Sequence, residues 1–105
     1  MTTASTAKPA FLLVQVQAKN LEALVQRYAG GAIQSLAQFG GEMIAGTPAP
    51  KVFEGKWEGN WAAVLRFPSL EMAEAWYNSP EYQPWRELRI QELTDGGQVL
   101  LIEGM

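Results

Sequence analysis

The sequence predicts one α+β domain of ferredoxin-like βαββαβ type, with a four-stranded antiparallel sheet and the helices on one of its faces. Three observations predict this fold. The 105 residues have the length of a single domain. Hydrophobic periodicity changes along the chain in the order strand, helix, two strands, helix, strand. Right-handed crossovers between such elements place both helices on the same face of an antiparallel sheet.

Residues 1–9 are small and polar, so they are expected to form a flexible N-terminal tail before a domain of residues 10–105. Residues 10–17 alternate like a strand, with apolar residues beginning both faces. The first element of the domain is therefore expected to be a strand that is covered on both sides.

A helix is expected from Asn20, a good N-cap residue, to about Phe39. The glycines Gly30 and Gly31 interrupt its pattern, which predicts a kink or a close approach to a neighbouring element. The glycines that follow Phe39 are expected to end the helix.

The second half of the chain shows two extended segments, a strand, two helices and a last strand. The expected elements are extended pieces at 42–45 and 51–54, a strand at 61–67, a helix at 70–77 capped by Ser69, a helix from Pro80 to about Thr94 capped by Ser79, and a strand at 98–103. A turn is expected at 95–97, where an aspartate precedes two glycines.

The strands are apolar on both faces, whereas a sheet with one wet face should alternate apolar and polar residues. In the first strand, Phe11 and Leu13 oppose Leu12 and Val14. A second copy packed on the open face is the simplest cover, so we expect a homodimer with a barrel at its interface. The alternative is that the N-terminal tail folds across the sheet.

Composition excludes several classes of function. The net charge is −3 and no segment is rich in Lys or Arg, so nucleic acid is not an expected partner. The chain has neither His nor Cys, which removes disulfides, thiolate nucleophiles and the usual metal ligands. No carboxylate cluster suggests a metal, and no cofactor is expected. The apolar run from Ala10 to Val16 is too short to cross a bilayer, so no membrane association and a cytoplasmic location are expected.

Arg89 is the strongest candidate for a functional residue. On a helical wheel it lies within the apolar stripe of the last helix, beside Tyr82 and Trp85. A buried guanidinium is costly unless it is paired, so Glu54, Glu58 or an anionic ligand is expected to face it. The alternatives are an internal Arg–Glu bridge, or an arginine whose stem packs while its head reaches water.

Two further residues attract attention. Arg66 shares a strand face with Ala62 and Val64, where it is expected either to meet Glu103 or Glu54 or to reach solvent. Trp57 lies in a glycine-flanked turn, where core packing is less automatic, which makes it the preferred pocket aromatic.

Several motifs together resemble the domain-of-unknown-function 1330 family over nearly the whole chain after the tail. They are VFEGKW at 52–57, FPS at 67–69, AWYNSPEYQ at 75–83, the arginine at position 89, FGG at 39–41 and IEG at 102–104. The resemblance implies a dimeric α+β barrel, related in shape to small cofactor-free monooxygenases and isomerases. It also implies that Glu54, Trp57, Tyr82 and Arg89 line a cleft between sheet and helices.

The chain departs from the family's pattern at two positions. Arg66 precedes FPS where relatives usually carry an acidic residue, and Trp61 stands where relatives tend to carry an arginine. If those two family positions pair, this chain has lost the pair, and with it the basis for assigning a shared ligand.

Three functions remain open from the sequence. The first is a cofactor-free enzyme for a small organic or aromatic acid, in which Arg89 holds the anionic group, Tyr82 and Trp57 contact the ring, and Glu54 is the base. The second is a binding or sensing module that uses the same residues without catalysis. The third is a structural dimer whose polar core residues only fix the fold.

Overall fold

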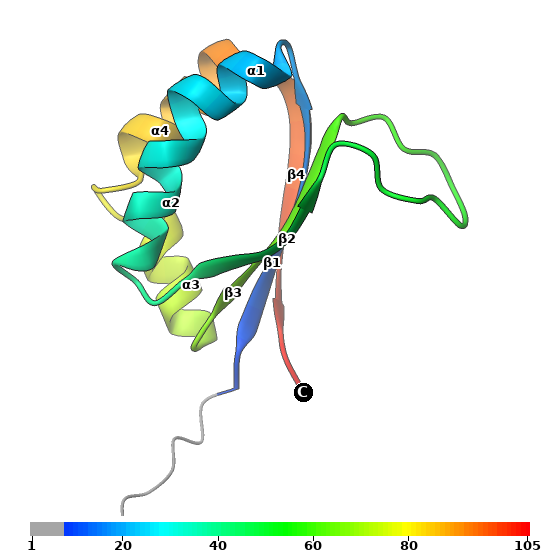
Figure 1. The fold of residues 1–105 in the computed structure, drawn as a ribbon. Coiled ribbons are helices and arrows are strands. Elements are labelled where there is room, and N and C mark those ends of the chain that lie inside the picture. The colour runs from blue at the N-terminus through cyan, green and yellow to red at the C-terminus, as the bar shows by residue number, and fades with distance from the viewer. Residues whose placement is uncertain (1–7) are drawn as a thin grey trace, which may run out of the picture.

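A computed structural model describes residues 8–105 and shows one antiparallel sheet in the strand order β2-β3-β1-β4 (Figure 1). Its strands are β1 (Ala10–Ala18), β2 (Glu42–Thr47), β3 (Trp61–Phe67) and β4 (Thr94–Glu103). This order fits the predicted ferredoxin-like connection. Most of the expected tail, residues 1–7, lies outside the described residues.

All helices lie on one face of the sheet, as predicted (Figure 1). They are α1 (Leu21–Leu24), the π-helical turn η1 (Val25–Ala29), α2 (Gly30–Ala37), α3 (Leu70–Tyr77), α4 (Gln83–Leu88) and the π-helical turn η2 (Arg89–Leu93). Within residues 8–105 no helix has both the length and the apolar character that spanning a bilayer requires.

The first helix forms where the sequence predicts it and passes through α1, η1 and α2. The side-chain oxygen of Asn20 accepts a hydrogen bond from the backbone N–H of Ala23 at 2.9 Å, which confirms the predicted cap. The glycine pair follows the π-helical turn. A Cβ atom on Gly31 would overlap the indole of Trp85, whereas one on Gly30 would meet nothing. The close approach predicted at this pair therefore occurs at its second glycine.

Strand β3 and helix α3 have the predicted bounds, and the Ser69 hydroxyl caps α3 by accepting from Met72 N. The predicted extended piece at 51–54 is wrong, because it belongs to a long loop. Strand β2 ends at Thr47, opposite Ala62 of β3. The prolines that follow at 48 and 50 have no N–H to continue the ladder.

The two other boundaries also differ from the prediction. Residues 79–82 form a turn in which Ser79 Oγ accepts from Tyr82 N and donates to the Trp76 carbonyl, so the last helix begins at Gln83 rather than at Pro80. The expected turn at 95–97 is instead part of β4, because these residues continue the pairing with β1 as far as a bulge beside Ala18.

The sheet has two apolar faces. Against the helices lie Ala10, Leu12, Ala63 and Phe67, all of them buried members of the core. On the open face, Leu13 lies between Val64 of β3 and Leu100 of β4. Leu100 and its strand neighbour Ile102 are 52% and 48% exposed. The predicted two-sided pattern is present, and the second copy that would cover the open face remains a prediction.

Candidate functional site

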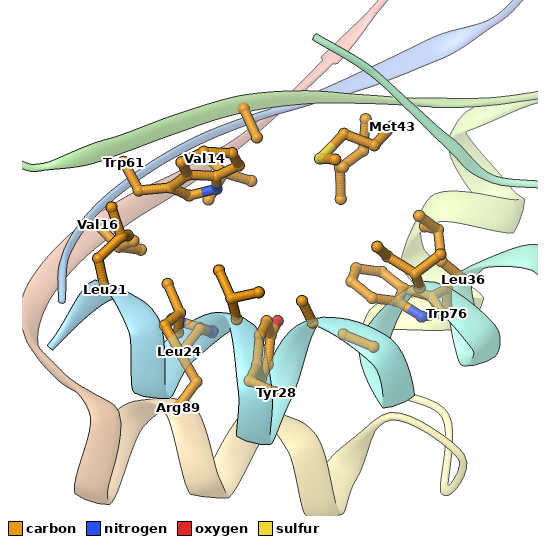
Figure 2. Close-up of a pocket in the computed structure, with 16 residues that line it drawn as sticks. Val14, Val16, Leu21, Leu24, Tyr28, Leu36, Met43, Trp61, Trp76 and Arg89 are labelled. Carbon is orange, nitrogen blue, oxygen red and sulfur yellow. The ribbon is translucent and has the colours of Figure 1, made fainter. Parts of the chain in front are cut away.

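A cavity of about 120 Å³, here called the chamber, lies between the sheet and the helices (Figure 2). Its roof is formed by side chains from the sheet, including Val14, Trp61 and Met43. Its floor consists of side chains from the helical layer, and Leu36 and Trp76 close one end. The remaining lining residues are Val16, Leu21, Leu24, Val25, Tyr28, Ala29, Ala32, Ile33, Ala63, Leu65 and Arg89. The chamber is therefore apolar except where Tyr28 and Arg89 meet it.

Arg89 reaches the floor of the chamber from η2 and is only 8% exposed (Figure 2). Within residues 8–105 the ion pairs are Lys19–Asp95, Arg27–Glu92 and Arg66–Glu42, so no carboxylate pairs with Arg89. The internal Arg–Glu bridge considered from sequence is not formed among residues 8–105. A buried cation without a protein carboxylate is the property that makes a small anion a fitting partner.

Two phenols lie beside the guanidinium and are hydrogen bonded to each other. The hydroxyls of Tyr28 and Tyr82 are 2.6 Å apart and hydrogen bonded. Tyr82 is 2% exposed and stacks on Trp76 with ring centroids 4.0 Å apart. Trp76 is itself held by donation from Nε1 to the Ser35 hydroxyl at 3.0 Å. This chain of contacts fixes Tyr82, and Tyr82 in turn orients the Tyr28 hydroxyl that lines the chamber.

The electrostatics keep Tyr28 neutral and Arg89 charged. Burial raises the pKa of Tyr28 far above its ordinary value; the Tyr82 phenol raises it further, and Arg89 only partly opposes the change. Burial by itself lowers the pKa of Arg89, but the phenols of Tyr82, Tyr28 and Tyr77 outweigh it and the pKa is raised. Tyr28 is therefore a hydrogen-bond donor or acceptor at neutral pH, and not a base.

This arrangement can hold a small anion at one end of an apolar space. The guanidinium offers donors in a planar fork that suits a carboxylate. The chamber is close in size to cavities that accept one aromatic ring. No Asp or Glu is among the residues that line the chamber, so residues 8–105 place no carboxylate base there.

The structure brings two of the predicted site residues together and places the other three elsewhere. Tyr82 lies beneath the chamber and Arg89 lines it. Glu54 is exposed and Trp57 is half-buried, both in the loop between β2 and β3. Arg66 lies on the open face opposite Phe11, where it pairs with Glu42 at 3.7 Å rather than with Glu54 or Glu103.

Sequence reasoning did not select Tyr28, and it did not place Trp61 and Trp76 in the wall of a cavity. Tyr28 falls on the apolar stripe of the first helix, where an aromatic residue is typical of core. The feature of the sequence that could have indicated Tyr28 is its hydroxyl group, since a buried phenol needs a hydrogen-bond partner.

Solved structures share this fold at low sequence identity. The RPA0582 protein of unknown function from Rhodopseudomonas palustris has a TM-score of 0.74 at 13% identity, covering 93% of this chain and 83% of its own. Its methylated form gives a TM-score of 0.76 at 12% identity, over 94% of this chain and 82% of that one. An uncharacterized NIPSNAP-like domain protein from Burkholderia xenovorans gives 0.57 at 13% identity, over 93% and 86%. These identities establish the fold alone.

The fold and chamber thus define a small α+β protein with an apolar site between its sheet and its helices. A sequence model of the domain of unknown function DUF1330 matches residues 9–105, and the chain belongs to this family. This confirms the family resemblance read from its motifs. No curated protein matches the sequence.

Proposed function

We propose that the protein is a homodimer in which each protomer binds a small organic acid in its chamber. The apolar part of the acid, an aromatic ring or a compact hydrocarbon group, occupies the space between Trp61, Met43 and Trp76. Its carboxylate lies on Arg89 and accepts a hydrogen bond from Tyr28. Binding is the function that the protomer supports best, because its chamber has a cation and a phenol but no carboxylate base.

One observation carries this proposal: Arg89 is buried against an apolar cavity and has no carboxylate partner within residues 8–105. An arginine kept only for structure would be expected to pair with an acid or to extend its head into water. The neutral phenols beside it orient the guanidinium but do not balance its charge. A ligand carboxylate would supply both the charge and the hydrogen bonds.

The dimer rests on the open face of the sheet. Its central row joins Ala45, Val64, Leu13 and Leu100 across all four strands. A contiguous apolar surface of this kind is typical of an interface. Packing two such faces together would bury both rows and leave each chamber on the outer side of its own sheet.

The test is calorimetric titration with three probes of matched shape. Phenylacetate carries the ring and the anionic group, phenylacetamide is neutral, and 2-phenylethylamine is a cation. We expect phenylacetate to bind and the other two probes to bind at least about tenfold more weakly, since only the acid carries a negative charge that can pair with Arg89. Equal affinity for the acid and the amide would show that the chamber does not select an anion.

A further inference from the structure

Residues 48–60, here called the arm, join β2 to β3 and leave the body of the protein. Figure 1 shows the arm extending from the sheet on the side away from the helices. It therefore points to the same side as the open apolar face. A molecule that packs on the open face of the sheet would therefore also contact the arm.

The outer part of the arm carries two exposed apolar side chains between Lys51 and Glu54. Phe53 is 87% exposed and Val52 is 44% exposed. An almost bare phenylalanine is unusual on a surface loop, which is normally polar. The mouth of the chamber is also apolar, because three of its lining residues, Val25, Ile33 and Met43, are 57%, 46% and 44% exposed. Each protomer thus presents two exposed apolar side chains on its arm and an apolar opening to its chamber that it does not fill itself.

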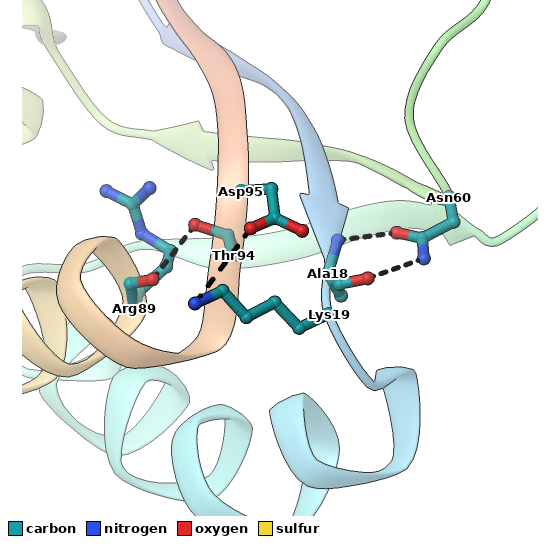
Figure 3. A network of polar contacts seen from close by, with 6 residues as sticks. All are labelled: Ala18, Lys19, Asn60, Arg89, Thr94 and Asp95. Atoms are coloured by element: carbon teal, nitrogen blue, oxygen red, sulfur yellow. Dashed lines mark hydrogen bonds and ion pairs between the residues drawn. The ribbon is translucent and has the colours of Figure 1, made fainter.

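The root of the arm is fixed, so its direction is set by the fold. The Asn60 side chain accepts from Ala18 N at 2.7 Å and donates to the Ala18 carbonyl at 2.9 Å (Figure 3). Asn60 N also donates to the Val16 carbonyl. Gly59 lies so close to this strand that a Cβ would be 2.7 Å from the Val16 oxygen and 3.0 Å from Trp57 Cη2. The indole of Trp57 therefore packs closely against Gly59 at the base of the arm.

We propose that in the homodimer the arm of each protomer reaches around the partner's sheet and closes the mouth of the partner's chamber. This inference rests on the proposed function, since it needs the dimer and the chamber. About half of the arm, in extended form, spans up to roughly 20 Å. Facing sheets pack about 10 Å apart, and the chamber lies directly behind the partner's sheet. The tip of the arm, around Phe53 and Glu54, can therefore cover the distance.

The exchange gives the exposed groups a role. Phe53 packs between the apolar residues that form the rim of the partner's mouth, and the ligand is then shielded from water. Glu54 follows it directly and reaches the mouth of the partner's chamber, whose lining has no carboxylate of its own, while Arg89 stays available to the carboxylate of the ligand. Each complete site is thus assembled from two copies, and the carboxylate that catalysis would require comes from the second copy.

Cross-linking tests the exchange in the full-length chain, which has no native cysteine. The variants are Phe53→Cys, on the arm, and Ile33→Cys, on the rim; both positions are exposed, so each substitution should cost little stability. The two single variants are mixed, allowed to exchange subunits and treated with a short bismaleimide. The matched control pairs Phe53→Cys with Glu74→Cys, which is exposed on α3 and does not line the chamber.

We expect a covalent dimer from the arm–rim pair, with the two cysteine peptides joined in mass spectra, and at least tenfold less from the control pair. A dimer in solution that gives no arm–rim product would overturn the inference, as would equal yields from both pairs. A monomer in solution would overturn it together with the dimer. Because the cross-link needs no ligand, a protein that forms it but does not bind phenylacetate would contradict the acid site alone.

Discussion

Replacing Arg89 with methionine separates a ligand-binding arginine from a structural one. Methionine keeps most of the length of the stem and removes the charge and all five donors. The guanidinium is buried beside neutral phenols and has no carboxylate partner within residues 8–105. Removing it therefore leaves no orphaned opposite charge, which is the main cost of breaking a buried ion pair.

The expected magnitudes follow from that environment. Replacing a buried ion pair with apolar side chains of similar volume is often neutral or stabilising by about 1–4 kcal/mol, and Arg89→Met leaves no partner carboxylate unpaired among residues 8–105. In a domain of this size each kcal/mol shifts the melting temperature by roughly 4–8 °C. Loss of hydrogen bonds from the guanidinium to a ligand carboxylate should cost about 3 kcal/mol, or roughly 100-fold in the Kd of phenylacetate.

Thermal unfolding and calorimetric titration measure the two effects on the same samples. We expect Arg89→Met to melt at or above the wild-type temperature and to lose phenylacetate binding. Arg27→Met is the matched control, because Arg27 pairs with Glu92 on the surface and should change neither quantity much. A variant that loses several kcal/mol of stability, or that still binds phenylacetate with wild-type affinity, would refute the reasoning.

Three further predictions concern packing, assembly and pH. In chemical denaturation, Gly31→Ala should lower the free energy of unfolding by about 1–3 kcal/mol, because its methyl group would overlap the indole of Trp85. Gly30→Ala should raise it by up to about 1 kcal/mol, because its methyl group would meet nothing. Equal effects would contradict the packing described. Leu100→Glu should shift the dimer towards monomer in sedimentation, because Leu100 lies on the open face of the sheet. Gln91→Glu, which adds the same charge at an exposed position of η2 on the helix side, should not. An unchanged Leu100→Glu dimer would contradict the proposed interface. Because the pKa of Tyr28 is raised by folding, its contribution to stability is fully present below pH 10.0 and is lost as pH rises further, since the phenol ionises first in the unfolded chain. The Tyr28→Phe variant should therefore lose stability less steeply at alkaline pH. An unchanged slope would contradict this account.

Local patterns in the sequence were enough to predict the regular elements. Strand β3 alternates cleanly and ends at a proline, and Ser69 then starts α3, so both elements follow from neighbouring residues. The piece at 51–54 has a strand-like composition, but the sheet has no partner for it once the prolines end β2. Whether an apolar segment pairs depends on its neighbours in space, and the sequence around Val52 and Phe53 does not contain that information.

The candidate site could be predicted only in part, for a similar reason. Arg89 is detectable because a charge within an apolar stripe violates the local pattern. Tyr28 does not violate its own stripe, and its hydrogen-bond partner Tyr82 is 54 positions away in the sequence. Glu54 and Trp57 were grouped with Arg89 by motif, yet within one protomer they lie on the arm. Their predicted place at the site stays a prediction that depends on the second copy.

A crystal structure of the protein grown with 4-bromophenylacetate tests the central claim most directly. The account predicts an anomalous bromine signal inside the chamber, between the sheet and the first helix, with the carboxylate on the guanidinium of Arg89. A saturated crystal in which the chamber remains free of the probe, or in which its carboxylate lies away from Arg89, would contradict the account.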